Sequence, residues 1–261
     1  MAGSMVETVL EVLTKRWSVV VALRDKPRTK PELVDEVGVS RSTVDRAVGD
    51  LEDEDVATYE DGRYRLTSFG GLACEAHDLS RRCLTGLCDA RDLVEQLPDA
   101  GDGSAIAFAN ATVVRPEPHR PDLAMRRFVE LLNEADRVRG VSPVVVEPYV
   151  EVCQRRVAED GMELDLVVAQ PVYDVLRREF GAAFEDVLQA DHASVVATDA
   201  DIPVGMAIID RDDERELAVV LYSATGISGL IRNDDPAAVG WALEVFERMR
   251  ARTVEPESRT T

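Results

Sequence analysis

The sequence predicts a multidomain α/β protein, and three observations lead to this fold class. The first 70 residues contain short amphipathic helices and a tight hairpin, a long helix with an apolar stripe follows, and the remainder alternates strands with helices. We therefore expect four parts, at residues 1–69, 70–98 and 99–252, with a flexible tail at 253–261. A length of 261 residues and a hydrophobic content of 45% are sufficient for more than one buried core.

The N-terminal part opens with helical periodicity. Apolar residues recur at helical spacing between residues 5 and 23, which predicts one amphipathic helix there. Residues 25–28 break the pattern, after which Thr29 and Glu32 have the spacing of a capping box. These signals predict a second, short helix that starts after Thr29 and ends at Gly38.

A tight turn at residues 38–40 separates the second helix from a third. Ser40 is a typical N-cap, and residues 41–51 place their apolar side chains on one face of a helix. Two strands, at 56–60 and 63–67, flank Asp61-Gly62, the dipeptide that favours a two-residue hairpin turn. Helix, helix, turn, helix and hairpin form a winged helix-turn-helix.

The segment from Lys30 to Val44 resembles the helix-turn-helix of archaeal and bacterial winged-helix transcription regulators. This resemblance implies double-stranded DNA as a partner. The third helix and its cap present hydroxyl and guanidinium groups that suit base edges and phosphates, and the wing adds two arginines that can reach an adjacent phosphate or the minor groove. The candidate DNA-binding residues are Ser40, Arg41, Ser42, Thr43, Arg46, Arg63 and Arg65.

Two alternatives stay open for this region. Arg46 lies four residues before Asp50, so the two side chains are spaced to form an ion pair on the helix surface. The winged helix as a whole could also bind protein, as an adaptor of the transcription machinery, because residues 1–70 hold 10 basic and 14 acidic groups and lack a positive footprint.

The surface chemistry is acidic and poor in lysine. The chain carries 50 acidic and 30 basic residues, a formal net charge of −20, and its only lysines are Lys15, Lys26 and Lys30. This composition resembles that of proteins from halophilic archaea, and molar salt shortens the Debye length to about 3 Å, so the net charge does not exclude DNA. No apolar stretch reaches the roughly 18 residues of a membrane span and no signal peptide is evident, so we expect a cytoplasmic protein without a membrane partner.

The predicted long helix carries a coiled-coil stripe. Its apolar and small residues alternate three and four steps apart, at Phe69, Leu72, Ala76, Leu79, Cys83, Gly86, Ala90, Leu93 and Leu97. The stripe predicts a homodimer, which would place two recognition helices on a two-fold operator. The alternative is that the stripe packs on its own subunit.

Cysteines and a histidine on this helix raise the question of a metal site. Cys74, His77, Cys83 and Cys88 all fall within it, yet Cys74 and Cys88 would be about 21 Å apart on a continuous helix. We therefore expect no metal and no cofactor. A metal-responsive or thiol-responsive regulator remains an alternative.

The C-terminal part alternates predicted strands and helices. We expect strands at 105–109, 112–114, 144–147, 163–169, 193–197, 204–210 and 216–222, and helices at 122–135, 149–159, 172–180 and 236–251. This order predicts an α/β domain with a mixed sheet.

Three segments of this part resemble the sensor domain of the archaeal methanogenesis and filament-formation regulator family, at residues 148–151, 163–168 and 229–250. This family is itself similar to the TrmB-like sugar-responsive regulators. The resemblance implies a fold like that of phospholipase D without its catalytic residues. The His-x-Lys pair of that chemistry is not in the sequence, since no lysine follows Lys30. Serine-hydrolase, phosphate-loop and dinucleotide motifs are also missing, so we expect no catalytic residues and no enzyme.

A sensor domain implies a small-molecule effector. Ligands bind where strands end and loops converge, and the segment 222–229 reads as such a loop. The candidate ligand-binding residues are Tyr149, Tyr222, Ser228, Arg232 and Asn233. For Asn233 the alternative is a structural role at the start of the last helix.

Overall fold

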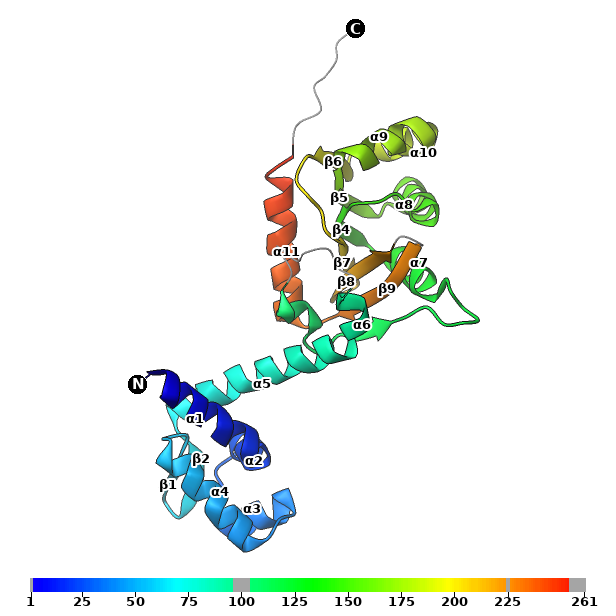
Figure 1. The fold of residues 1–261 in the computed structure, drawn as a ribbon. Helices are drawn as coiled ribbons and strands as arrows, with labels where there is room; N and C mark the ends of the chain where they lie inside the picture. Colours follow the sequence, from blue (N-terminus) through cyan, green and yellow to red (C-terminus); the bar gives the residue numbers. More distant parts are fainter. Residues whose placement is uncertain (1, 96–103, 224–225, 254–261) are drawn as a thin grey trace. The chain divides into compact units, whose positions relative to one another are not determined.

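The computed structural model describes residues 2–95, 104–223 and 226–253 (Figure 1). The chain divides into two compact units, Met1–Arg81 and Arg82–Thr261, and each is described by itself. The predicted end of the long helix and the loop after it, at 96–103, lie outside the described residues, as does the tail beyond Thr253.

The first unit contains the predicted winged helix-turn-helix. Its elements are α1 (Ala2–Lys15), α2 (Trp17–Asp25), α3 (Lys30–Val37), α4 (Arg41–Asp53), β1 (Ala57–Glu60), β2 (Arg63–Leu66) and the beginning of α5 (Ser68–Asp89). The single helix predicted over 5–23 is wrong, because Arg16 leaves helical geometry and separates α1 from α2. The core of the unit is formed by buried side chains of all four of these short helices, including Leu13, Leu33 and Leu51.

Local hydrogen bonds fix the ends of the two helices of the motif, as predicted. Thr29 and Glu32 form the capping box, with the Thr29 amide donating to Glu32 Oε2 at 2.7 Å. Gly38 ends α3 in the left-handed region, at a φ of 71°, which glycine adopts without strain. Ser40 then caps α4 by accepting a hydrogen bond from the Thr43 amide at 3.2 Å.

Arg28 anchors the wing, although the sequence pattern placed this residue only in the break between two helices. Arg28 and Tyr64 exchange backbone hydrogen bonds of 2.9 and 2.7 Å, which ties the segment before α3 to β2. The Arg28 side chain is buried, donates to the Ala22 carbonyl at 3.0 Å, and pairs with Asp25 and Glu36. A buried guanidinium is tolerated here because carboxylates and a carbonyl satisfy it.

Helix α5 contributes to both units, and its stripe differs between them. In the first unit Phe69 and Leu72 are exposed to 50% and 69%. In the second unit Cys83, Ala90 and Leu93 are buried, and a Cβ at Gly86 would lie 1.8 Å from the Phe108 carbonyl oxygen. The C-terminal half of the stripe therefore packs on its own subunit, as in the alternative. The long helix also ends earlier than predicted, at Asp89, and α6 (Arg91–Val94) follows.

The second unit is built on a mixed seven-stranded sheet, which confirms the predicted fold class. The strand order is β3-β9-β8-β7-β4-β5-β6; β4, β5 and β6 are parallel and the other pairs are antiparallel. The strands are β3 (Thr112–Val114), β4 (Arg137–Ser142), β5 (Glu163–Ala169), β6 (Ala193–Thr198), β7 (Gly205–Arg211), β8 (Glu214–Ser223) and β9 (Gly226–Asn233).

Helices cover both faces of this sheet (Figure 1). One face carries α7 (Leu123–Glu134), α8 (Glu147–Asp160), α9 (Gln170–Glu179) and α10 (Gly181–Leu188), and the other carries α11 (Pro236–Arg250) with the 3₁₀ helix η1 (Ala105–Phe108). Each face has its own buried core. Among the helices described, none is long and apolar enough to cross a lipid bilayer.

Several predicted elements of this unit are wrong. Residues 105–108 form a 3₁₀ helix, the strand predicted at 144–147 lies instead at 137–142, and α10 was not predicted. The segment read as a loop at 222–229 belongs largely to the antiparallel strands β8 and β9. In β9, a Cβ at Gly229 would lie 2.5 Å from Leu93 Cδ1, so the glycine permits close packing within a strand and does not mark a loop.

Candidate functional site

The N-terminal end of α4 gathers short hydroxyl side chains around a cap. Ser40 Oγ lies 3.0 Å from Ser42 Oγ and 2.9 Å from Thr43 Oγ1. The first amide groups of a helix carry a partial positive charge that suits a phosphate. Arg41 is exposed at the same end. The structure thus brings Ser40, Arg41, Ser42 and Thr43 together at the start of the recognition helix.

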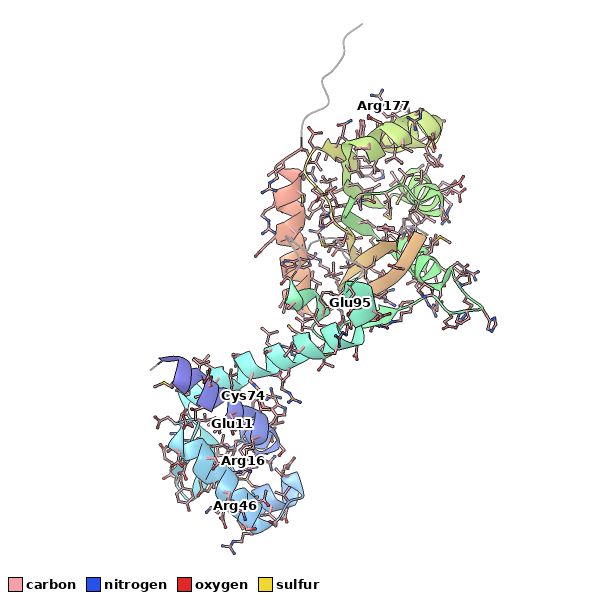
Figure 2. All side chains as sticks on the ribbon, viewed as in Figure 1. Glu11, Arg16, Arg46, Cys74, Glu95 and Arg177 are labelled. Carbon is pink, nitrogen blue, oxygen red and sulfur yellow. The ribbon has the colours of Figure 1, made fainter. Side chains whose placement is uncertain are left out.

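The arginines of α4 are not tied to their own helix. Asp50, the predicted alternative partner of Arg46, pairs instead with Arg16 at 2.6 Å. Asp45 pairs with Lys30 at 2.7 Å, and this ammonium holds the pKa of the Asp45 carboxyl below its ordinary value. Neither Arg41 nor Arg46 makes a hydrogen bond or an ion pair within the part of the chain that the structure describes, although the charge of Arg41 also helps to lower the pKa of Asp45. Figure 2 shows Arg46 toward the outer edge of this unit.

The two wing arginines have intramolecular partners. Arg63 Nη1 donates to Glu32 Oε2 at 2.8 Å and to the Pro27 carbonyl at 3.2 Å, and Arg65 pairs with Glu60 on the facing strand. Both arginine side chains remain about half exposed, at 47% and 49%. Exposed pairs of this kind contribute about 0–1 kcal/mol, so a phosphate can displace the carboxylate at modest cost.

One surface side chain of the wing was missed by sequence reasoning. Tyr59 is 55% exposed and its ring packs on that of Tyr64, with centroids 4.8 Å apart. An aromatic ring held at the tip of a hairpin offers both an apolar face and a hydroxyl donor. The available sequence signal was the alternation of polar and apolar residues in β1. This pattern places Tyr59 on the wing but does not indicate that its side chain is exposed.

A run of four acidic residues lies at the end of α4 that is opposite to Arg41. Glu52, Asp53, Glu54 and Asp55 follow the last apolar residue of α4, whereas Arg41 begins the helix. A helix of 13 residues is about 20 Å long, which exceeds the Debye length even at 0.1 M salt. These four acidic residues therefore lie away from Arg41 and the cap at Ser40.

In the α/β unit the structure brings together two of the five predicted ligand residues. Tyr149 on α8 and Tyr222 on β8 line one cavity of about 70 Å³, next to a second of about 90 Å³ that also contacts Tyr149. The Tyr149 hydroxyl is buried without a hydrogen-bond partner among the described residues. Burial raises the pKa of both phenols and raises that of the nearby Cys153 thiol to about 12. Ser228 lies in β9, and its hydroxyl is also buried and unpartnered there.

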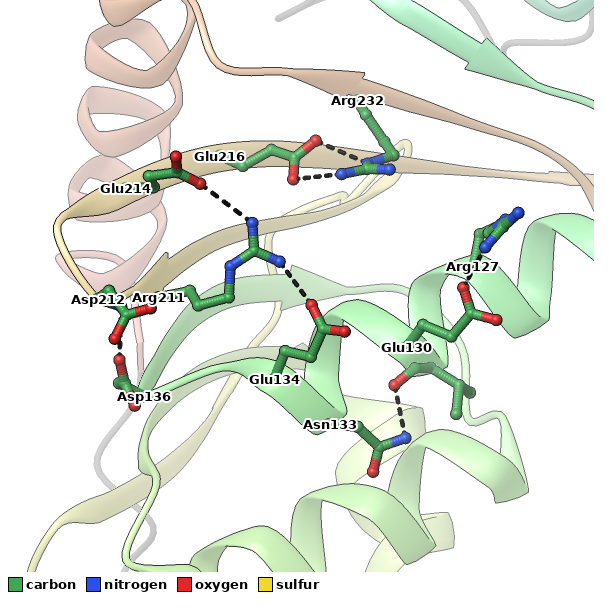
Figure 3. A network of polar contacts seen from close by, with 11 residues as sticks. Arg127, Glu130, Asn133, Glu134, Asp136, Arg211, Asp212, Glu214, Glu216 and Arg232 are labelled. Atoms are coloured by element: carbon green, nitrogen blue, oxygen red, sulfur yellow. Dashed lines mark hydrogen bonds and ion pairs between the residues drawn. The ribbon is translucent and has the colours of Figure 1, made fainter.

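Arg232 lies in a separate, polar hollow of about 330 Å³ (Figure 3). Its guanidinium donates to both oxygens of Glu216 on the neighbouring strand, at 2.7 and 2.8 Å. These bonds raise the pKa of Arg232 above its ordinary value. Arg211 in the same hollow bridges Glu134 of α7 and Glu214 of β8, at 2.5 and 3.1 Å. An anion entering this hollow would compete with carboxylates already in place.

Asn233 is buried, and its side chain forms hydrogen bonds with backbone groups. Its amide donates to the carbonyls of Ala107 and Ala109, at 2.9 and 2.8 Å. Its oxygen accepts from the Asp235 amide at 2.9 Å, and Asp235 in turn caps α11. These bonds join η1, β9 and the start of α11, which is the structural role considered as the alternative.

A winged helix-turn-helix is followed in the same chain by an α/β domain, which is the organisation of a DNA-binding transcription regulator. The profile of the methanogenesis regulatory protein FilR1 middle domain matches residues 121–252, about half of the chain, and the chain belongs to this family. The HVO_A0261 N-terminal domain matches residues 6–91. These matches confirm the family resemblance that the sequence motifs predicted.

Two of the solved structures that match this chain are remotely similar to it. TrmBL2, described as an archaeal chromatin protein with a novel mode of DNA binding, is 15% identical over 96% of this chain and 99% of its own, with a TM-score of 0.40. The phospholipase D family member Nuc from Salmonella typhimurium is 11% identical over 57% of this chain and 100% of its own, with a TM-score of 0.43. No curated protein sequence shows significant similarity.

Proposed function

We propose that the chain is a homodimeric transcription regulator of the cytoplasm, that its winged helix binds operator DNA, and that a small metabolite in the α/β domain modulates this binding without catalysis. The observation that carries the proposal is the exposure of Arg41 and Arg46 and their lack of an ion-pair partner. Both side chains are exposed on α4 and make no ion pair among the described residues.

The chemistry of this helix supports contacts with base edges. An arginine pairs with two acceptors of guanine in the major groove, and short hydroxyl side chains such as Ser42 and Thr43 hydrogen-bond to bases or phosphates. Arg41 and Arg46 would reach the groove without first breaking an ion pair. In the molar salt that the acidic composition suggests, counterion release contributes little, so base contacts must supply more of the affinity.

Exposed apolar side chains of the first unit support a dimer. Five large ones lie on α1 and at the start of α5: Met5, Val6, Leu10, Phe69 and Leu72. Several such residues on neighbouring turns are more than the scattered single exposures of a monomeric surface. We propose that these two helix faces pair with a second copy, which would present two recognition helices to a two-fold operator.

An effector would act through the geometry of that dimer. A ligand shifts an equilibrium between two conformations only by its difference in affinity for them. We propose that the α/β domain binds the metabolite more tightly in one arrangement of the two DNA-binding units. The metabolite then changes the affinity for operator DNA, and DNA changes the affinity for the metabolite by the same factor.

The proposal is tested by fluorescence anisotropy with DNA from upstream of the protein's own gene, in a potassium chloride series that reaches molar concentration. Wild type should bind this DNA selectively, and Arg41→Ala plus Arg46→Ala should abolish the selectivity. Arg177→Ala is the matched control, because Arg177 is exposed on α9, outside the winged helix. Failure of wild type to select any sequence across the salt series would contradict the proposal and favour the protein-binding adaptor.

The dimer is tested separately by sedimentation velocity. Leu72→Glu places a charge on the exposed half of the α5 stripe and should convert the protein to a monomer, whereas Leu84→Glu, on an exposed position later in the same helix, should not. Wild type that sediments as a monomer would contradict the homodimer.

A further inference from the structure

The two cavities near Tyr149 share part of their walls, and we name them the two lobes of the Tyr149 site. Both are lined by Ser142, Tyr149, Cys153 and Leu166, with Tyr222 and Phe128 completing the wall of the smaller lobe. We infer that this site takes a small, uncharged, mainly apolar molecule, about the size of one aromatic ring, that hydrogen-bonds to the Tyr149 hydroxyl. The inference rests on the proposed function only in naming this molecule as the effector.

The size of the ligand follows from the volumes. The lobes measure about 90 and 70 Å³. An apolar protein cavity of about 150 Å³ stays dry and accommodates benzene. Neither lobe alone is that large, but the two meet at Tyr149 and Cys153, so a small rotation of the Tyr149 ring would join them. The ring is held on one side by Phe128, in an edge-to-face contact with centroids 4.8 Å apart.

The charge of the ligand follows from the walls. No acidic or basic side chain is among the described residues that line either lobe. The phenols of Tyr149 and Tyr222 and the Cys153 thiol have their pKa values raised by burial, so all three are neutral at pH 7. A carboxylate or ammonium placed here would lose its hydration without gaining a counter-ion, which strongly disfavours its binding. The walls therefore select against charged molecules.

The hydrogen-bonding group of the ligand follows from Tyr149. Ser142 Oγ donates its hydrogen to the Val144 carbonyl at 2.9 Å. The buried Tyr149 oxygen has no such partner among the described residues. A buried hydroxyl without a hydrogen-bond partner is unfavourable, and a ligand oxygen that accepts from it would remove part of that penalty.

The test uses the full-length protein and three probes of one shape, phenol, toluene and benzoate, with binding followed by ligand-observed NMR and calorimetry. Phenol should bind most tightly, toluene more weakly, and benzoate not at all. Tyr149→Phe should weaken phenol about tenfold and leave toluene unchanged, because it removes only the hydroxyl. Tyr173→Phe is the matched control, since Tyr173 is buried on α9, packs on Phe184, and does not line either lobe.

A second variant guards against an effect on folding. Leu166→Phe fills the wall that the lobes share and should abolish binding of both phenol and toluene; circular dichroism checks that the variant is folded. The inference is overturned if benzoate binds as tightly as phenol, if Tyr149→Phe leaves phenol affinity unchanged, or if folded wild type binds neither phenol nor toluene.

DNA binding is measured in the same samples, which separates this inference from the proposed function. Selective DNA binding without probe binding overturns the inference and leaves the regulator proposal standing. Probe binding that follows the Tyr149→Phe pattern but does not alter DNA affinity supports the site and contradicts its role as the effector site. Probe binding by a protein that selects no DNA supports the site and contradicts the regulator.

Discussion

The winged helix contains two pairs of exposed arginines in opposite circumstances. Arg41 and Arg46 of the recognition helix have no ion-pair partner among the described residues, whereas Arg63 and Arg65 of the wing are held by Glu32 and Glu60. All four are the same residue type on the same small unit. The two pairs differ in what their neighbouring carboxylates bind. Asp45 and Asp50 form ion pairs with residues outside α4, whereas Glu32 and Glu60 form ion pairs with the wing arginines.

This difference assigns different roles to the two pairs. Asp50 pairs with Arg16 and Asp45 with Lys30, so neither carboxylate forms an ion pair with Arg41 or Arg46. On the wing, by contrast, each arginine already serves the fold, because Arg63 joins β2 to the capping box of α3. We expect the free pair to read bases and the engaged pair to contribute a phosphate contact that trades one carboxylate partner for another.

The largest effect is expected from removing the free pair one arginine at a time. Arg41→Ala and Arg46→Ala should each cost about 1–3 kcal/mol of operator binding and relax specificity at different base positions. The measurement is anisotropy with a set of operator variants, each carrying one base substitution. A uniform loss on all sequences would mean that these side chains contact phosphates.

A smaller and sequence-independent effect is expected from the wing. Arg63→Ala plus Arg65→Ala should weaken binding to operator and random DNA equally and should reduce the slope of log affinity against log salt by about two. The measurement is a salt titration with both kinds of DNA. A selective loss on operator DNA would place these arginines in a groove and remove the contrast between the pairs.

The fold of the first unit was predictable because its signals are local. Thr29 with Glu32, Gly38 and Ser40 each act within four residues of themselves. The hairpin turn follows from Asp61-Gly62, where both residues have positive φ angles, of 52° and 81°. Local chemistry of this kind is readable without knowing the tertiary structure.

The α/β unit was harder to predict because distant partners decide its strands. Arg137 and Arg139 make β4 look polar, yet Asp165 and Asp210 on the adjacent strands neutralise them, at 3.5 and 2.7 Å. The valines at 144–146 look like a strand but lie between β4 and α8. The periodicity of a sequence depends only on the polarity of each residue. It gives no information about a counter-ion that lies 28 or 71 residues away along the chain.

The candidate sites show the same limit. Polar residues of the recognition helix were predictable from the motif, but the engagement of Asp50 by Arg16, 34 residues earlier, was not. Tyr149 and Tyr222 could be named from the sequence, whereas their common cavity and the unpartnered hydroxyl arise only from the packing of α8 over the sheet. Arg232 and Asn233 were named with them, and the structure gives both intramolecular partners.

A still smaller effect would come from redirecting an acid toward the free pair. Arg16→Ala releases Asp50, which lies four residues after Arg46 and would then pair with it on the surface of α4. Such a pair is worth about 0.3–0.5 kcal/mol, so operator affinity should fall about twofold. Adding Asp50→Ala to Arg16→Ala should restore it. Equal affinities in all three proteins would show that the partner of Asp50 does not govern Arg46.

The smallest effect expected is a pH dependence carried by Glu32, which links the wing to α3. The Thr29 amide and hydroxyl, and then Arg63, donate to this carboxylate and hold its pKa below the ordinary value of 4.5. A depressed pKa stabilises the folded state above about pH 4.5, and this contribution is lost as the pH falls through the folded-state value. Glu32→Gln should therefore flatten the decline of stability in acid.

The measurement is urea unfolding followed by Trp17 fluorescence in a Trp241→Phe background, so that the signal reports the first unit alone. Glu32→Asp is the matched control, because it keeps a titrating carboxylate but shortens its reach to Thr29 and Arg63. If Glu32→Gln and wild type lose stability in parallel below pH 4.5, the charge of Glu32 contributes nothing to folding stability, and its ion pair with Arg63 costs nothing to break. Arg63 would then be as available to phosphate as Arg41 is to bases, and the contrast between wing and recognition helix would disappear.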